Sequence, residues 1–504
     1  MSARTTSGLP ADLSDAAHRY LDAFPAGDVV AFPIHPLDRL GLPVWVVALF
    51  PEDEALSGIM PYGVGYGATD EAAVLGGLGE IAEMVWPTLT LGQRAKTRGS
   101  YTELTRSWGA HAVADPFTLC LPAGSPVDHD TVLEWVEAKR WRDGSTVLVP
   151  IDLAAYSSKE LSPGYKPFTT IISNGMGAGP DLDWAIGHGL CEILQRDGNG
   201  LLFRALDRGV TLELDGDLPA STRAILDRFD VAGIRAIPKF ATDQYGLPNL
   251  YCAGVDERGE PAAPIMVTAC GEACHADRAA ALDKCLTEFA ASRARKAFAH
   301  GPADLVAQVA PEGYVARFMA QAGGAAKSSD RRAFDAMRDW TGRSATELRG
   351  WLADNVLSER SSHRFSDLPT QAAPDGHARA ATARAAVEAA GFDVLYVDMS
   401  PADRSVAVVK VIVPGMEVET MSYYRIGARN TEKLLALDSP LIQFGREEGA
   451  ALRRIRLSPA DAERLNHPLF DTAAADRLVG PLYPLYREPE AHHVAWKSDG
   501  EARA

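Results

Sequence analysis

The spacing of apolar side chains predicts three similar helices in the first two thirds of the chain. Residues 69–85, 181–197 and 277–298 carry apolar residues three and four positions apart, as on the buried face of an amphipathic helix. A glycine-rich segment precedes each helix, at residues 61–67 and 173–179 and, more loosely, at 270–271. Because glycine turns sharply without a Cβ penalty, each site is interpreted as a strand, a glycine turn and a helix, with Ile171 and Ile172 ending the second strand. The pattern therefore predicts a repeated structural unit.

Each predicted helix also carries a glutamate at a corresponding position. The interval from Gly67 to Glu80 equals that from Gly179 to Glu192, and Glu288 stands at the matching place in the third unit. For any one helix, the simpler interpretation is a solvated acid near the helix end. If the three units pack around one centre, however, several carboxylates converge there, and an unpaired, partly buried carboxylate costs on the order of several kcal/mol. Such an arrangement requires cations.

Magnesium suits a group of carboxylates, because it binds their oxygens together with the phosphates of a substrate. Glu192, Gln195 and Arg196 share one face of the second helix, and Arg293 follows Glu288 on the third. Arginine has the planar, permanently charged side chain that binds phosphate through two hydrogen bonds. We therefore expect Arg196 and Arg293 to bind phosphates together. The simpler alternative is that each arginine pairs with a nearby acid.

The rest of the apolar pattern predicts an α+β fold. Further helices are expected at residues 14–24, 101–108, 131–142, 222–229, 331–357 and 380–390, and strands at 29–34, 43–50, 145–153, 231–238, 250–255, 264–270, 393–399 and 405–413. Residues 323–329 and 367–377 are interpreted as breaks, and the proline-punctuated chain from residue 457 onward as irregular. The predicted parts are a flexible segment and helix (1–28), a core with the three glutamate-bearing helices (29–322), the C-terminal part of the fold (323–456) and an extension (457–504).

The composition is that of a globular protein with an ample core. The chain has 504 residues, of which 46% are hydrophobic and 23% charged, and its formal net charge is -17. Because no basic cluster offsets this charge, nucleic acid and anionic membranes are disfavoured as partners. No apolar run is long enough to span a membrane and no signal peptide is recognisable, so we expect a cytoplasmic protein. The six cysteines are expected to be thiols, and Cys270, Cys274 and His275 form only a weak metal motif.

Four stretches carry an ordered set of motifs. They read LGEIAE at residues 78–83, SNGMGAG and LCEILQRD within 173–197, LTEFAASR at 286–293, and VVKVIVPGMEVE and RIGARN within 408–430. In this order the motifs resemble those of the YcaO family, over roughly residues 33–430. The resemblance implies a YcaO fold, in which similar strand–glycine turn–helix units surround a central nucleotide and Mg²⁺ site. It also implies an ATP-dependent enzyme that phosphorylates a peptide backbone amide oxygen and leaves an azoline, a thioamide or an amidine.

The resemblance assigns roles to particular side chains. It implies Mg²⁺ binding by Glu80, Glu83, Glu192 and Gln195, ATP binding by these four with Arg196 and Arg293, and catalysis by Glu80, Glu192 and Arg196. The substrate would be a ribosomally made peptide. A separate partner protein is expected for peptide recognition or sulfur delivery, of the E1-like (ocin-ThiF-like) or TfuA-like kind, and a homodimer is compatible with the resemblance.

The chain also departs from the family pattern. Other residues replace polar family residues at Tyr66, Gly76, Met84, Gly177, Pro180, Trp184, Gln195 and Ala291. Trp184 is expected either to fill the space of a metal-binding carboxylate or to pack in the core. The chain does not end in the Pro-x-Pro-x-Pro tail of many cyclodehydratases, which favours a thioamide or another modification over an azoline. The alternative function is a degenerate, non-catalytic YcaO-fold subunit that binds peptide or a catalytic partner.

Overall fold

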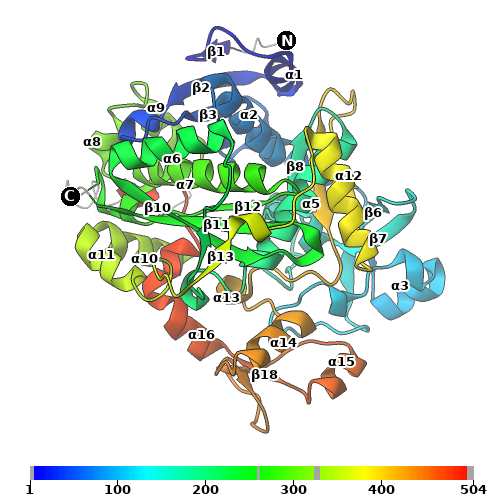
Figure 1. Ribbon diagram of the computed structural model, residues 1–504. Coiled ribbons are helices and arrows are strands. Elements are labelled where there is room, and N and C mark those ends of the chain that lie inside the picture. The colour runs from blue at the N-terminus through cyan, green and yellow to red at the C-terminus, as the bar shows by residue number, and fades with distance from the viewer. Residues whose placement is uncertain (1–4, 258–260, 323–329, 496–504) are drawn as a thin grey trace, which may run out of the picture.

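Helices and strands are mixed throughout the molecule. The structure is a computed structural model that describes residues 5–257, 261–322 and 330–495. The described strands form sheets of four, five, six and three strands, which agrees with the predicted α+β class. In Figure 1 the four-stranded sheet lies at the top, the five-stranded sheet in the middle and the three-stranded sheet at the bottom. The expected break at 323–329 lies outside the described residues.

The N-terminal sheet is covered on both faces. Its strands are β1 (Thr5–Ser7), β2 (Gly27–Pro33), β3 (Val44–Pro51) and β4 (Tyr62–Tyr66), in that order, beside α1 (Asp15–Ala23) and α2 (Asp70–Trp86). Consecutive residues of β3 pack in different cores, on opposite faces of the sheet. Val47 packs in the cluster that contains Leu78 of α2, whereas Val46 packs in the cluster that contains Phe298. The predictions for residues 14–24, 29–34 and 43–50 are confirmed.

The six-stranded sheet contains a strand where a helix was predicted. Its order is β5 (Thr97–Gly99), β6 (Leu133–Arg140), β14 (Leu395–Asp398), β15 (Ala407–Ile412) and β8 (Met176–Gly179), and β7 (Thr146–Pro150) pairs with β6. Residues 131–142 are therefore not helical. Both faces of β6 are buried, with Trp135 in one core and Val136 in another, so apolar residues stand side by side and imitate helical spacing. Helices α3 (Tyr101–Trp108), α5 (Leu182–Asn199) and α12 (Gly376–Ala389) accompany this sheet.

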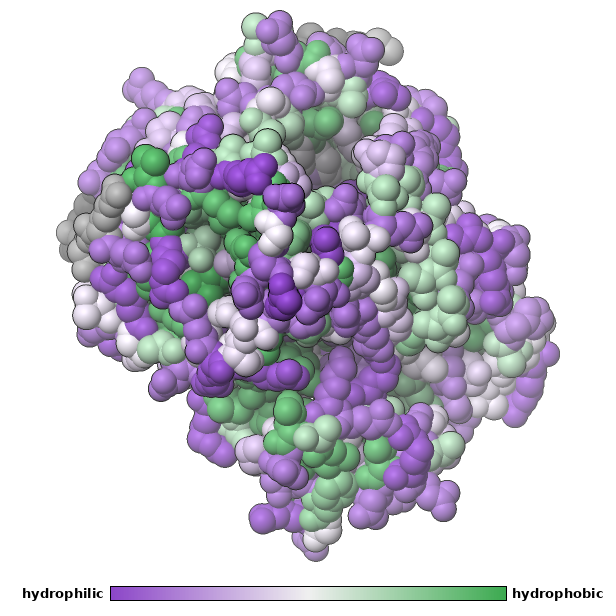
Figure 2. Space-filling view, in the orientation of Figure 1, coloured by the Kyte–Doolittle hydropathy of each residue, from purple (hydrophilic) through white to green (hydrophobic). Residues whose placement is uncertain are grey.

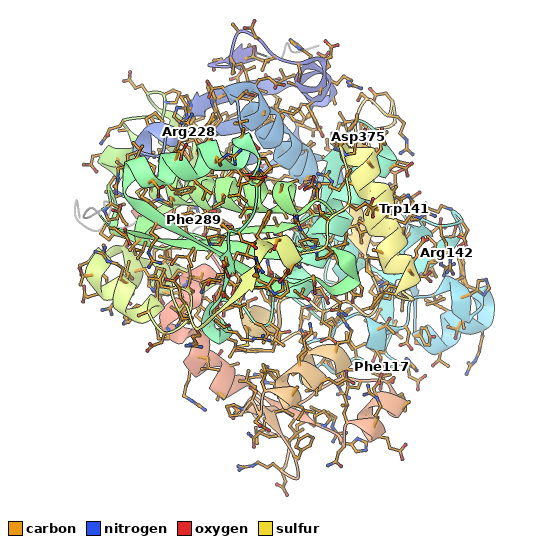
Figure 3. The ribbon with its side chains drawn as sticks, in the orientation of Figure 1. Phe117, Trp141, Arg142, Arg228, Phe289 and Asp375 are labelled. Carbon is orange, nitrogen blue, oxygen red and sulfur yellow. The ribbon has the colours of Figure 1, made fainter. Side chains whose placement is uncertain are left out.

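The five-stranded sheet supports the third helix. Its order is β12 (Gly271–Cys274), β11 (Asn249–Asp256), β10 (Ile234–Thr242), β9 (Val210–Glu213) and β13 (Ser361–Arg364), with α6 (Ala220–Ala232) and α7 (Arg278–His300) alongside. Phe289 of α7, labelled in Figure 3, is fully buried against Gly254 of β11 and lies 5.6 Å from Phe229 of α6. The strand predicted at 264–270 is wrong. A 3-10 helix, Pro264–Val267, stands there, because a proline suits the start of a helical turn and cannot donate to a sheet.

The chain beyond residue 300 adds helices and a small sheet. The helices are α8 (Ala303–Val306), α9 (Tyr314–Gln321), α10 (Arg331–Thr341), α11 (Ala345–Leu352), α13 (Thr420–Tyr423), α14 (Ala428–Ala436), α15 (Pro459–Arg464) and α16 (Thr472–Val479). The sheet order is β16 (Ile442–Gln443), β18 (Leu469–Asp471) and β17 (Leu452–Arg454). The chain from residue 457 is thus not irregular, because Ser458 and Asp471 cap two helices there. The sheet also pairs β17, which precedes the predicted boundary at residue 456, with β18, which follows it.

Most of the two glycine-rich segments form strands, which corrects the predicted glycine turns; a turn remains at residues 174–175, where Gly175 has a φ of 87°. Every second residue of β4 and of β8 is a glycine. Residues 171–172 are not in a strand. A Cβ on Gly65 would stand 1.8 Å from the carbonyl oxygen of Ala73, and one on Gly177 would stand 2.2 Å from that of Ala185. The glycines therefore let the following helix lie directly on its strand.

The three strand–helix units close into a ring. Besides packing on its own strand, α2 contacts β8 of the second unit, α5 contacts β12 of the third, and α7 contacts β4 of the first. Each helix is consequently held between two strands. This arrangement places the three glutamate-bearing helices next to one another around the ring.

Candidate functional site

Two of the glutamates are oriented in the same way by their own units. Glu80 on α2 accepts a hydrogen bond from the backbone N–H of Val64 at 2.9 Å, and Glu192 on α5 accepts one from that of Gly175 at 2.8 Å. Glu83, one turn after Glu80, reaches across the ring and accepts from the backbone of Ala178 in β8. Backbone donors thus fix these carboxylates without neutralising their charge.

The carboxylates of Glu80, Glu83 and Glu192 interact electrostatically. Glu80 is open to solvent, but the protein around it desolvates its charged form and raises its pKa to about 7, and Glu288 and Glu192 raise it further. Desolvation also raises the pKa of Glu83 well above its usual range, with Glu192 and Glu80 contributing. The pKa of Glu288 is raised mainly by desolvation as well. These acids repel one another, and a divalent cation between them would relieve that repulsion.

Gln195 belongs to an internal network. Its side chain is 4% exposed, its Oε1 accepts from the Lys284 Nζ at 3.2 Å, and its Nε2 donates to Glu272 at 3.4 Å. The network joins α5 to the strand and the helix of the third unit. The structure therefore shows the Gln195 oxygen bonded to an ammonium group.

Arg196 lies between an acid of its own helix and one of the third unit. Its Nε is 3.9 Å from Glu192, and its Nη1 is 3.5 Å from Glu272 in β12. Arg204 approaches the other oxygen of Glu272 at 3.3 Å. The Nε atoms of both arginines are buried without a hydrogen-bond partner. Two guanidinium groups with unused donors therefore stand beside the acidic centre, as binding of an anion would require.

A cavity of about 500 Å³ opens beside these arginines. Arg196, Arg204 and Arg295 line it, together with residues 171–174 and the C-terminal segment 485–490. Its polar lining and its size suit a charged ligand of cofactor dimensions. The positive charge of Arg295, which lines this cavity, acts to lower the pKa of Glu80. The cavity is therefore electrostatically linked to the carboxylates.

Arg293 is not brought to this cavity. It is fully buried, and it pairs with Asp38 through Nε at 2.7 Å and Nη2 at 3.2 Å, while Nη1 donates to the carbonyl oxygen of Met266 at 2.8 Å. Its guanidinium thus joins α7 to the loop between β2 and β3. The structure does not place Arg293 with Arg196, and its neighbour Arg295, two positions on, lines the cavity instead.

Tyr66 and Trp184, which replace polar residues of the family pattern, both contact other parts of the protein. The hydroxyl of Tyr66, on β4, donates to Glu288 of α7 at 2.7 Å and so binds the first unit to the third. Trp184 packs beneath the first turn of α12, against Gly376 and His377, so it has a packing role. Trp141 lies nearby and donates to Asp183, and Figure 3 shows it beside α12.

Sequence reasoning did not single out Arg204, Glu272, Arg295, Lys410 or Glu488. Glu272 follows Gly271 of the third unit, but Val64 and Met176 stand at the corresponding positions of the first two units, so the repeat did not indicate it. Lys410 of β15 is 3% exposed and bonds to the carbonyl of Ile172; burial lowers its pKa to about 7. The repeat pattern carries no signal for Glu488, which reaches the site from the far end of the chain.

The acidic centre suits Mg²⁺, which binds few protein ligands, better than a metal whose ligands all come from the protein. Within the described ranges, no three His, Cys, Asp or Glu side chains are placed to hold one ion, and this includes the cysteine motif near residue 270. Magnesium needs only one or two protein carboxylates, since water and substrate phosphates complete its shell. Glu80, Glu83 and Glu192 can supply these ligands.

Comparison with known proteins agrees with this architecture. A family model described as YcaO cyclodehydratase, ATP- and Mg²⁺-binding, matches residues 64–417. An uncharacterised protein of Methanothermobacter thermautotrophicus is 26% identical over 394 residues, which are 78% of this chain and 90% of that protein.

Two solved structures share the fold. A heterocyclase in complex with substrate and cofactor is 20% identical, with a TM-score of 0.57, over 79% of this chain and 51% of its own. YcaO from Methanopyrus kandleri, bound with AMPPCP and Mg²⁺, is 18% identical, with a TM-score of 0.51, over 79% of this chain and 88% of its own. The chain thus spans about half the length of the heterocyclase.

Three strand–helix units closed around converging acids and arginines define a protein of the ATP- and Mg²⁺-binding class. Since the family model covers more than half of the residues, the chain belongs to the YcaO family, whose cyclodehydratases are ATP-dependent enzymes. Among the residues that the structure describes, no helix has the length and apolar character to cross a membrane.

Proposed function

We propose that the protein uses ATP and Mg²⁺ to activate a backbone amide of a ribosomally made peptide. A nucleophile attacks the amide carbon, the γ-phosphoryl group passes to the amide oxygen, and loss of phosphate leaves an azoline, a thioamide or a related group. One observation carries the proposal: backbone donors orient Glu80 and Glu192 on neighbouring helices, and Glu192 lies 3.9 Å from Arg196, which lines a large polar cavity.

Each group has a distinct role in this proposal. One or two of the carboxylates of Glu80, Glu83 and Glu192 would hold Mg²⁺, which supplies positive charge to the phosphates when it is bound. The partnerless Nε atoms of Arg196 and Arg204, together with Arg295, would donate to phosphate oxygens. Transfer of a phosphoryl group depends chiefly on positioning and neutralisation of charge, so the protein needs no nucleophile of its own. The attacking atom would come from the peptide or from external sulfide.

A thioamide or another backbone modification fits this chain better than an azoline. The C-terminal segment that lines the cavity reads Tyr486-Arg487-Glu488-Pro489-Glu490 and contains no Pro-x-Pro-x-Pro run. This segment places an ion-paired side chain beside the cavity. Sulfide delivery or peptide recognition would then require a separate partner protein.

The second candidate is a non-catalytic subunit of the same fold, and two contacts favour it. Gln195 is bonded to Lys284 and Glu272, and Tyr66 is bonded to Glu288. Both positions, which carry polar ligand-binding residues in the family pattern, are used here for internal bonds. A subunit of this kind would retain the ring of units without turning over ATP.

Calorimetric titration with a non-hydrolysable ATP analogue, with and without Mg²⁺, separates the two candidates. We expect Mg²⁺-dependent binding that Glu192→Gln weakens at least roughly tenfold, because a hard cation loses a charged ligand. Glu71→Gln, on the first turn of α2, is the matched control and should bind like the wild type. Absence of nucleotide binding in the presence of Mg²⁺ would favour the non-catalytic subunit. Mass spectrometry of a modified peptide then distinguishes loss of water from exchange of oxygen for sulfur.

A further inference from the structure

The carboxylate of Glu488 is held by three basic side chains on the last turns of α7. Arg295 donates through Nη2 at 3.0 Å and approaches the second oxygen through Nη1 at 3.0 Å. The Nζ of Lys296 donates at 2.6 Å, and the Nε2 of His300 lies 3.3 Å away. These ion pairs hold the pKa of Glu488 well below its usual range, although desolvation opposes them.

The cationic groups of Arg295 and Lys296 need an anion, whereas burial lowers the pKa of His300, so its ring contributes a hydrogen-bond donor rather than a charge. The side chains of Lys296 and His300 are 4% and 1% exposed, so neither can be solvated fully in place of a partner. An ammonium group buried to this extent is stable only when it is paired and hydrogen-bonded. Glu488 supplies that anion from 192 positions further along the chain.

This basic cluster borders the cavity of the proposed function. Arg295 and Glu488 both line it, together with Arg196 and Arg204. Arg295 also acts electrostatically on Glu80, and Glu488 and Glu80 both raise the pKa of Arg295. An anion that replaced Glu488 would therefore lie next to the acidic centre and within the same pocket.

The backbone is anchored on both sides of Glu488. The Tyr486 hydroxyl accepts from the N–H of Ala205 at 2.8 Å, and the N–H of His492 donates to the carbonyl of Ala299 at 2.7 Å. The His492 ring is buried among Phe298 and two further aromatic rings. Glu488 can thus leave the basic cluster by rotating its side chain, without release of the segment.

We propose that Arg295, Lys296 and His300 form a phosphate-binding site that Glu488 occupies as an internal carboxylate, and that a phosphate group displaces it. Donors from three side chains suit a tetrahedral oxyanion, and the bidentate reach of arginine suits two of its oxygens. The proposal deepens the proposed function by naming a ligand position in the same cavity. It predicts a measurable competition between Glu488 and phosphate. The apparent affinity for phosphate is the intrinsic affinity multiplied by the fraction of molecules in which Glu488 has left the site.

Glu488→Gln tests the competition with inorganic phosphate as the probe. The substitution keeps the shape of the side chain and removes its charge. In a thermal unfolding series with phosphate, against sodium chloride at equal ionic strength, we expect a saturable stabilisation of the variant. Its half-maximal phosphate concentration should be at least roughly tenfold lower than that of the wild type. Glu488→Ala, if it folds, should show the same gain.

Glu388→Gln is the matched control. Glu388 pairs with Arg384 on α12 at 3.0 Å and does not line the cavity, so its variant should respond to phosphate like the wild type. Equal phosphate responses of Glu488→Gln and the wild type would overturn the proposal, as would a gain for acetate as large as that for phosphate. A parallel gain in affinity for the ATP analogue would identify the ligand as a nucleotide phosphate, and a gain for phosphate alone would identify free phosphate. The phosphate result can be read even if the wild-type protein binds no nucleotide.

Discussion

Replacement of Arg293 by methionine should destabilise the fold and leave nucleotide affinity unchanged. The Arg293 side chain is 0% exposed and that of its partner Asp38 is 6% exposed, so bulk solvent screens their interaction little. Methionine keeps much of the side-chain volume and leaves the Asp38 carboxylate unpaired. Removal of one partner from a buried ion pair costs about 3–5 kcal/mol. We expect the free energy of unfolding, measured by urea titration with tryptophan fluorescence, to fall by this amount.

Two further variants make the measurement specific. Arg338→Met, whose side chain is 52% exposed and 3.7 Å from Asp335, should cost only about 0–1 kcal/mol. Asp38→Asn in the Arg293→Met background should recover part of the loss, because the double variant leaves no buried charge of this pair unpaired. A stable Arg293→Met protein with at least tenfold weaker binding of the ATP analogue would refute the structural role and restore the phosphate role expected from sequence.

Three smaller predictions follow from single contacts. Burial lowers the pKa of His492 in the folded state to about 3, so between pH 6.5 and 3 this histidine is protonated in the unfolded chain but not in the folded one. Its contribution lowers the free energy of unfolding by about 1.4 kcal/mol for each pH unit of acidification in this range. Urea titrations should show that His492→Phe removes this dependence. Gly65→Ala should destabilise by at least about 1–3 kcal/mol in urea titrations, because its Cβ would strike the α2 backbone, whereas Gly350→Ala, in open space on α11, should be neutral or stabilising. Tyr66→Phe should cost about 1–3 kcal/mol by the same measurement, because the partly buried carboxylate of Glu288 loses its donor.

The repeat was predictable because equal spacing has equal geometric consequences. Glu80 and Glu192 stand at the same interval from their glycine segments; Glu80 accepts a hydrogen bond from Val64 within β4, and Glu192 accepts one from Gly175, immediately before β8. The role of the glycines was misjudged, because glycine composition indicates either a turn or a close backbone contact, and only the packed helix decides between them. The helix predicted at 131–142 failed for a related reason, since a strand buried on both faces loses its alternation.

The partners of charged side chains were not predictable from the sequence. Arg293 pairs with Asp38, 255 positions earlier, and Glu488 reaches α7 from 192 positions later. Local spacing contains no information about such pairs, so Arg293 was expected at the phosphates and Arg295 was overlooked. The position of Arg196 within its helix, by contrast, follows from a local interval to Glu192, and the structure keeps the two side chains adjacent.

The closed ring has a consequence for the order in which the protein folds during synthesis. The bond from Tyr66 to Glu288 joins residues 222 positions apart, so the first unit emerges from the ribosome long before the helix that completes its surroundings. The strands of the six-stranded sheet come from even more distant parts of the chain, and residues 485–490 complete the cavity wall last. Because loops of this length close late, the acidic centre should form only after the strands at residues 395–412 have been synthesised. A nascent chain arrested before residue 480 would then carry all three glutamate helices but lack one wall of the cavity and the carboxylate that neutralises the end of α7.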